Sequence, residues 1–142
     1  MNQRYTLSHH DAMRVLEVIR AELDRDGRGA AVAVADEHGE LVALLRTDGC
    51  PLPSINNAIN KAFVSAREGV PSGKVGQKAR DEDWNMTNYG DLRYTGWGGG
   101  VPLIYQGQVV GAVGVSGLPE AEDVVLAELG AKALGGGAPS RP

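Results

Sequence analysis

The chain has 142 residues, enough for one domain; 42% of them are apolar and 23% are charged. A formal net charge of −4 argues against a broad nucleic-acid surface, which needs clustered positive charge. The single cysteine, Cys50, excludes an internal disulfide and a cysteine-only zinc cage. No apolar run approaches the roughly 20 residues that span a bilayer, and the N-terminus lacks a signal-peptide apolar stretch. These features predict a cytoplasmic protein with neither nucleic acid nor membrane as a partner.

The first predicted element is a helix over residues 8–25. Ser8 and Asp11 resemble a capping box in which Asp replaces Glu, a pattern typical of a helix start. Gly27 and Gly29 then end the helix. Its apolar residues recur at helical spacing, at Ala12, Leu16, Ile19 and Leu23.

Two short apolar segments follow, over residues 30–35 and 41–46, and the turn between them contains Gly39. This pattern predicts a β-hairpin. After a loop, Ser54 is predicted to cap a second helix, which Gly69 ends. The apolar stripe of that helix comprises Ile55, Ala58, Ile59, Ala62, Phe63 and Ala66.

The region after the second helix is polar and irregular. Residues 74–83 are predicted to form one or two helical turns at most, and residues 84–100 show no clear period. Two further strands are predicted over 101–105 and 108–115, joined by a tight turn.

The last helix is predicted to begin near Pro119, with Val124, Val125, Leu129 and Leu134 directed inward. Two hairpins and three principal helices in this order predict an α+β fold with an antiparallel sheet in a single domain. That domain is expected to span residues 1–134, and residues 135–142 are expected to form a flexible tail.

Several separated stretches occur in the order known from one family. They are residues 34–41 (VADEHGEL), 46–49 (RTDG), 58–62 (AINKA), 98–103 (GGGVPL) and 107–117 (GQVVGAVGVSG). Together they resemble the GlcG/HbpS-like family of haem-degrading type. The resemblance implies a profilin-like sheet flanked by helices and a homo-oligomer, dimeric or larger. It implies less about chemistry, because members are variously linked to haem binding, glycolate-utilisation operons and corrinoid-enzyme fusions.

Residues 81–97 hold four of the seven aromatic residues of the chain, interleaved with polar ones. Aromatic bodies with polar tips suit a small-ligand pocket or a protein interface, and a buried structural lid is the alternative. In a pocket, the indoles would contact the ligand while phenols and carboxylates move protons. The candidates are Trp84 and Trp97 for contact, Tyr89 and Tyr94 as proton donors, Asp91 or Asp83 as base, and Arg93 to hold negative charge.

The glycine run offers a second group of candidates. The amides of Gly99 and Gly100 can form an anion-binding nest, or the run is a tight bend that lets the sheet pack. Ser116 ends a strand just before the last helix, where helix amides can face a carboxylate.

Two cations complete the candidate site. Arg46 can clamp a substrate carboxylate in bidentate fashion, or pair with Asp48 to hold the loop. Lys61 lies one position off the apolar stripe of the second helix. It is either a solvated lysine or a pocket cation that polarises a carbonyl.

Haem would need an axial ligand and a large apolar slot. The candidate ligands are His9, His10, His38 and a loop tyrosine. The alternative for each histidine is an exposed surface residue without a ligand role. No set of three or four residues has the spacing of metal ligands, so no metal site is predicted.

Three functional hypotheses remain. The first is an enzyme that needs no cofactor and binds a small polar or aromatic metabolite, with proton-transfer chemistry such as isomerisation, elimination or cyclisation. The second is a haem-binding or haem-handling protein. The third is a non-catalytic oligomeric scaffold. The polar-aromatic loop favours the first hypothesis, and the family resemblance favours the second.

Overall fold

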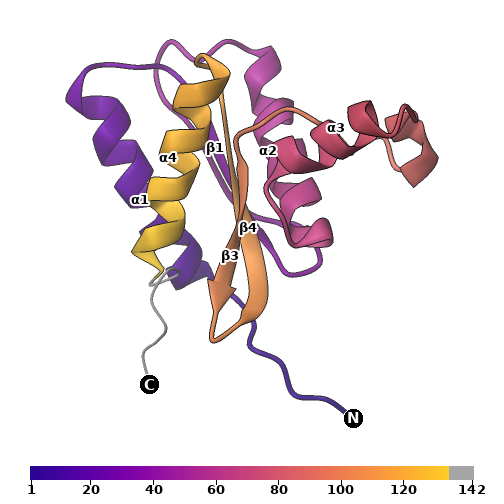
Figure 1. Ribbon diagram of the computed structural model, residues 1–142. Coiled ribbons are helices and arrows are strands. Elements are labelled where there is room, and N and C mark those ends of the chain that lie inside the picture. Colours follow the sequence, from indigo (N-terminus) through magenta and orange to yellow (C-terminus); the bar gives the residue numbers. More distant parts are fainter. Residues whose placement is uncertain (135–142) are drawn as a thin grey trace.

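The computed structural model describes residues 1–134, so the predicted tail at 135–142 lies outside the described residues. Three α-helices alternate with two hairpins, and a further helix and a 3₁₀ turn follow the second of these α-helices (Figure 1). The elements are α1 (His9–Arg25), β1 (Ala31–Asp36), β2 (Leu41–Arg46), α2 (Pro53–Glu68), α3 (Ser72–Asp81), η1 (Met86–Tyr89), β3 (Gly100–Tyr105), β4 (Gln108–Ser116) and α4 (Glu120–Ala133).

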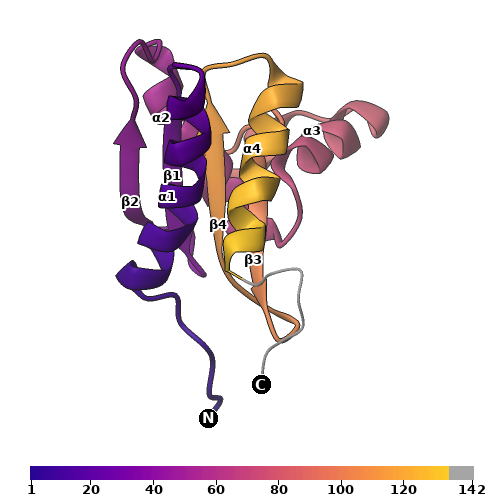
Figure 2. The ribbon, with the colours of Figure 1, turned by 90° about the vertical axis from the view of Figure 1, so that its left-hand side faces the viewer.

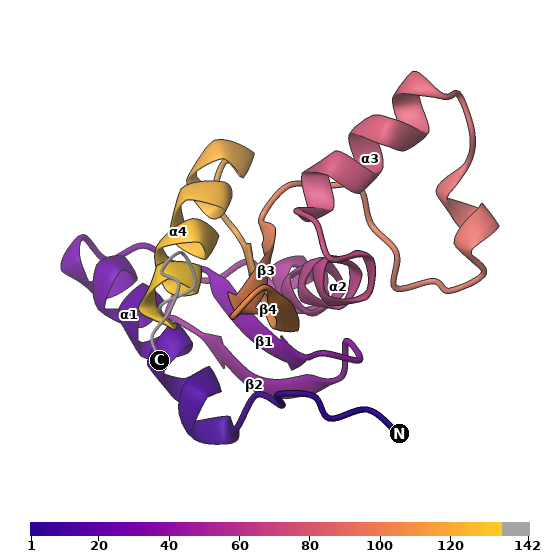
Figure 3. The same cartoon turned by 60° about the horizontal axis from the view of Figure 1, so that its bottom comes forward.

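The four strands form one antiparallel sheet in the order β2-β1-β4-β3. Helices α1 and α4 lie side by side on one face (Figure 2), and α2 covers the other face, with α3 extending away from the sheet (Figure 3). The α+β prediction is confirmed. Between residues 1 and 134, no helix is both long and apolar enough to cross a membrane.

The two faces of the sheet differ in side-chain size. Val32 and Val34 of β1 point into the main core beneath α1 and α4, whereas Ala31, Ala33 and Ala35 face α2. The α2 face also contains Gly114, where a Cβ would lie 2.2 Å from a backbone oxygen of α2. Small residues therefore allow α2 to pack very close to β1 and β4.

The helix starts only partly follow the predictions. The predicted capping box at Ser8 and Asp11 is present at the start of α1. The predicted cap at Ser54 is wrong: Pro53 is already helical, and no side chain caps α2. Proline suits the first helical turn because its fixed φ is preset and its missing N–H is not needed there.

Two other predictions are corrected. Helix α3 has 10 residues rather than one or two turns, because Val75 and Ala79 supply a buried apolar face within a polar segment. In α4, Val125 is 63% exposed rather than inward. The buried face contains Asp123, Leu126, Ala127 and Gly130, so one of the buried positions of this helix holds a charged residue.

Candidate functional site

Lys61 is the most unusual buried group of the described chain. It belongs to the face of α2 that packs on the sheet, and it is only 3% exposed. Its Nζ donates to the backbone oxygen of Val115 on β4 at 2.9 Å and to Oδ2 of Asp123 at 3.3 Å. The predicted alternative of a solvated lysine is therefore wrong, because the close packing of α2 on small sheet residues buries this side chain.

Asp123 is the buried partner of that ammonium group. It lies early in α4, is 2% exposed, and accepts a hydrogen bond from the backbone N–H of Leu118 through Oδ1 at 3.2 Å. Both carboxylate oxygens are thus occupied. The Lys61 ammonium has three N–H groups, and only two of them have partners among residues 1–134.

Burial and pairing act in opposite directions on the two groups. Burial lowers the pKa of Lys61, and the neighbouring Asp123 partly offsets this. Burial likewise raises the pKa of Asp123, opposed by Lys61 and by the backbone N–H groups of Leu118 and Gly117. Both shifts reduce the difference in proton affinity between amine and carboxylate, so proton transfer between them becomes easier.

The glycine run closes tightly around Lys61. A Cβ on Gly99, whose φ is +123°, would lie 2.9 Å from Lys61 Nζ, and one on Gly100 would lie 2.3 Å from the Lys61 backbone oxygen. The amide of Gly100 already donates to Ser72 Oγ at 2.9 Å, and that of Gly98 to Glu120 Oε2 at 2.5 Å. These contacts favour the packing interpretation of the run over the anion nest.

A cavity of about 360 Å³ opens beside the buried pair, within the size range of small-ligand pockets. It brings together three residues that the sequence predicts for the site: Lys61, Trp97 and Ser116. Sequence reasoning missed the other side chains. The remaining lining residues are Ser54, Asn57, Gly117, Leu118, Glu120 and Asp123.

The other aromatic residues of the loop form a separate cluster. Tyr89 and Tyr94 stack with ring centroids 3.9 Å apart, and Tyr94 packs edge-on against Phe63 of α2. The Tyr94 hydroxyl donates to Glu68 Oε2 at 2.5 Å. Burial raises the pKa of both tyrosines, with Glu68 adding to the shift. Neither residue lines the Lys61 cavity, so its chemistry does not include them.

Asp91 and Arg93 pair with each other beside this cluster. The two side chains approach to 3.0 Å, and the Arg93 guanidinium lies 3.8 Å from the centre of the Phe63 ring. Hydrogen bonds from Arg93 lower the pKa of Asp91, which weakens it as a base. Arg93 also contacts Glu40 at 3.5 Å. This pair does not line the Lys61 cavity, and its predicted roles remain predictions.

Trp97 separates the Lys61 cavity from a broad groove of about 690 Å³ between α3 and the loop. The groove brings Trp84 and Trp97 together, and Arg80 and Met86 also line it. Arg46 is exposed at the end of β2, in the same sheet row as Ala31 and Ser116. Among residues 1–134 it forms no ion pair with Asp48, contrary to one of the two expectations.

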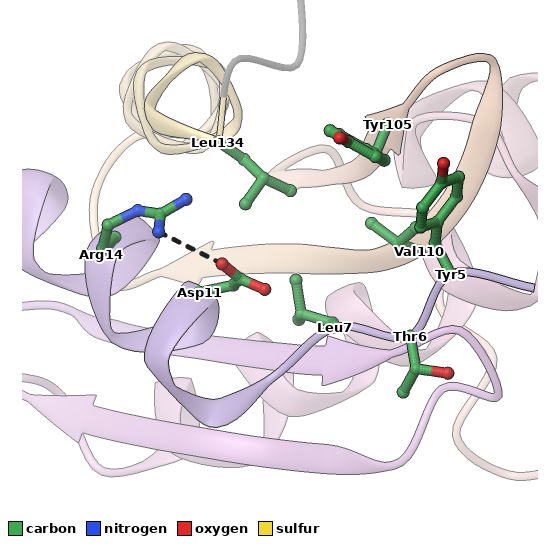
Figure 4. A pocket seen from close by; sticks show the side chains of 8 residues that line it. All are labelled: Tyr5, Thr6, Leu7, Asp11, Arg14, Tyr105, Val110 and Leu134. Carbon is green, nitrogen blue, oxygen red and sulfur yellow. Dashed lines mark ion pairs between the residues drawn. The ribbon is translucent and has the colours of Figure 1, made fainter. Parts of the chain in front are cut away.

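Another cavity, of about 300 Å³, lies at the opposite end of the sheet (Figure 4). Tyr5 and Tyr105 stand on one side of it, and the ion pair between Asp11 and Arg14 on the other. Leu7, Val110 and Leu134 supply its apolar surface.

The three histidines predicted as axial ligands do not face these cavities, whereas the loop tyrosine Tyr89 lines a separate cavity with Trp84 and Asn88. The His38 side chain is 76% exposed, and His9 and His10 are exposed at the start of α1. None of the three lines the Lys61 cavity, the α3 groove or the cavity of Figure 4. Met86 in the groove and the two tyrosines in Figure 4 are the lining side chains of types that ligate haem iron. The α3 groove, the largest of the three and lined by Met86, Trp84 and Trp97, is the one whose residues could hold haem.

The fold and cavity define a small α+β domain with a ligand-sized pocket between α2, the end of β4 and the start of α4. The chain belongs to the HbpS-like family: the family model described as "Haem degrading protein HbpS-like" matches residues 7–132. Protein GlcG of Escherichia coli K12 is 31% identical over 122 residues, which are 82% of this chain and 85% of the relative. An uncharacterized 15.0 kDa protein from the dhaT-dhaS intergenic region of Citrobacter freundii is 29% identical over 87% of this chain and 88% of its own length.

Solved structures agree with the fold. A double mutant of Streptomyces reticuli HbpS superposes with a TM-score of 0.84 at 27% identity, covering 95% of this chain and 91% of its own. The structure of a PduOC–heme complex superposes with a TM-score of 0.83 at 20% identity, covering 91% of this chain and 95% of that one. At that identity, the second likeness concerns the fold alone.

Proposed function

We propose that the protein binds a small polar metabolite with a carbonyl group in the Lys61 cavity and catalyses proton transfer on it without a cofactor. The observation that carries this proposal is a buried lysine–aspartate pair lining a cavity of about 360 Å³. A buried ionisable pair that borders a cavity with several polar groups is a candidate functional site.

Lys61 supplies the polarising cation. Its third N–H can donate to a ligand oxygen while Val115 and Asp123 hold the other two. An ammonium group in a water-poor site stabilises negative charge that develops on a carbonyl oxygen far better than it would in water. That charge is the one formed when a proton leaves the carbon next to a carbonyl.

Asp123 is a further catalytic candidate, which the sequence analysis did not include. Its raised pKa makes it a stronger base than an exposed aspartate, and Lys61 can relay a proton to it. Ser54, Asn57 and Ser116 offer hydroxyl and amide groups for orientation. Trp97, 58% exposed, stands at the rim, where its ring can cover a bound ligand.

The experiment follows hydrogen exchange in heavy water. Glyceraldehyde, a neutral carbonyl compound, and pyruvate, an anionic one, are incubated with the protein, and loss of the proton next to the carbonyl is followed by NMR. We expect enzyme-dependent exchange that Lys61→Met abolishes and Lys78→Met, on the exposed face of α3, leaves intact. Exchange at the rate of the protein-free control with both compounds contradicts the proposal.

Haem binding is the second candidate function, and the α3 groove of about 690 Å³ together with the family description supports it. Its test is a visible absorption titration with haemin, comparing the wild-type protein with Met86→Leu. A saturable, sharp Soret band that changes in the variant would support haem in the groove. The homo-oligomer expected from the family resemblance, including a purely scaffolding role, remains a prediction.

A further inference from the structure

We infer that Lys61 forms a covalent imine with its ligand, and that this ligand is a neutral hydroxyaldehyde or hydroxyketone. The inference rests on the proposed function and names both its substrate class and its chemical form. The structural basis is an amine that is buried, lines a cavity, and has a carboxylate within 3.3 Å. Desolvated lysines of this kind are the ones that serve as nucleophiles toward carbonyl compounds.

The step balances within the pair. The Lys61 ammonium passes a proton to Asp123, and the neutral amine attacks the carbonyl carbon to form a C–N bond. The carbinolamine oxygen then takes up one proton from the amine nitrogen and one from Asp123, and it leaves as water. The products are a protonated imine and one water, so the total charge of the reactants is conserved. Burial promotes the first transfer because it disfavours both charged forms.

The surroundings of Nζ suit an attack from the cavity side. Gly99 carries no side chain, and a Cβ at this residue would lie 2.9 Å from Lys61 Nζ and 2.6 Å from the backbone oxygen of Val115. The position therefore keeps the space around the amine free of side-chain atoms while the backbone still encloses it. Lys61 Nζ lies 2.9 Å from the backbone oxygen of Val115 and 3.3 Å from Oδ2 of Asp123. These two hydrogen bonds fix the direction of the third N–H of the ammonium group.

The charges of the cavity select the substrate class. Its lining side chains carry one positive charge, on Lys61, and two negative charges, on Glu120 and Asp123. Whether the shared proton sits on Lys61 or on Asp123, these side chains keep a net charge of −1, so an anionic oxoacid would meet a like charge, whereas a hydroxyl-bearing carbonyl compound would not. Ser54 and Asn57 provide hydrogen-bonding partners for those hydroxyl groups.

The test is reductive trapping of the full-length wild-type protein. Glyceraldehyde is added with sodium borohydride at neutral pH, and the modified residue is located by peptide mass mapping. The chain supplies its own reference amines, because Lys74, Lys78 and Lys132 are exposed on α3 and α4. We expect one reduced adduct per chain, on Lys61, with much less on the exposed lysines and a weaker signal when pyruvate replaces glyceraldehyde.

Two results would overturn the inference. If the adducts are spread over the exposed lysines and spare Lys61, no imine forms there. If pyruvate traps as well as glyceraldehyde, the substrate class is wrong. The proposed function is judged separately by hydrogen exchange: exchange without trapping at Lys61 removes the imine and leaves proton transfer, whereas the absence of both removes the function. Because trapping is done on the wild type, folding defects of a Lys61 variant do not affect the result.

Discussion

Removing one member of the Lys61–Asp123 pair should destabilise the protein far more than removing both. Lys61→Met keeps the length of the side chain but leaves Asp123 charged at 2% exposure, and Asp123→Asn leaves the ammonium in the same position. Breaking a buried pair in this way costs about 3–5 kcal/mol, whereas replacing both partners by neutral groups is often nearly neutral. The double variant should therefore lose at least about 2 kcal/mol less than the sum of the single losses.

The assay is a double-mutant cycle with urea unfolding at pH 7, supported by thermal melts. For a chain of 142 residues, about 3–5 kcal/mol corresponds to a fall in Tm of roughly 10–20 °C for either single variant. Circular dichroism of each variant before unfolding shows whether it is folded. Single variants that lose less than about 1 kcal/mol, or losses that simply add, would refute the reasoning that the two charges are buried and coupled.

Three further changes probe the site and its surroundings. Gly100→Ala should lower the free energy of unfolding by about 1–3 kcal/mol, because its Cβ would lie 2.3 Å from the Lys61 backbone oxygen; urea unfolding measures this. Trp97→Ala should weaken ligand binding with little change in Tm, whereas Tyr94→Phe should lose about 0.5–1.5 kcal/mol of stability and leave binding intact. The third change is in pH. Measured against the variant that lacks both Lys61 and Asp123, the free energy of unfolding of the wild type should fall as the pH rises from 3.8, the ordinary pKa of aspartate, through the raised pKa of Asp123. It should rise again as pH increases from the lowered pKa of Lys61 toward 10.5.

Each of these outcomes has a matched comparison. Gly107→Asn has open space around its Cβ and a φ that asparagine tolerates, so it should change stability much less than Gly100→Ala. The same pH series on the double variant removes the contribution of all other titrating groups. A wild-type curve that runs parallel to it at every pH would contradict the shifted pKa values of the pair.

The sequence predicts the parts of this protein that depend on local rules. The capping box at Ser8, the two β-hairpins and the ending of α2 at Gly69 are each visible within a few residues, and the α+β fold follows from them. Lys61 could be suspected because it neighbours an apolar stripe and lies in the family motif at residues 58–62. Its burial depends on the small residues of two distant strands, which no local pattern of α2 reveals.

The missed residue, Asp123, illustrates the limit of hydrophobic periodicity. When only apolar residues are assigned to the buried face of α4, the charged Asp123 is left out of that face. The predicted buried face is then rotated to include Val125, which is exposed. The polar-aromatic loop shows a second limit. Its aromatic residues are adjacent in sequence, but Trp97 lines the Lys61 cavity while Tyr89 and Tyr94 pack on Phe63.

The most direct test of the central claim, that the Lys61 cavity is the ligand site, is an NMR titration of ¹⁵N-labelled wild-type protein with glyceraldehyde. We expect saturable shifts of the Gly117 and Leu118 amides and of the Trp97 indole N–H, because all three residues line the cavity. The amide of Gly90, beside the aromatic cluster, should stay unchanged. Shifts confined to the neighbourhood of Gly90, or no saturable shift in the cavity, would contradict the account.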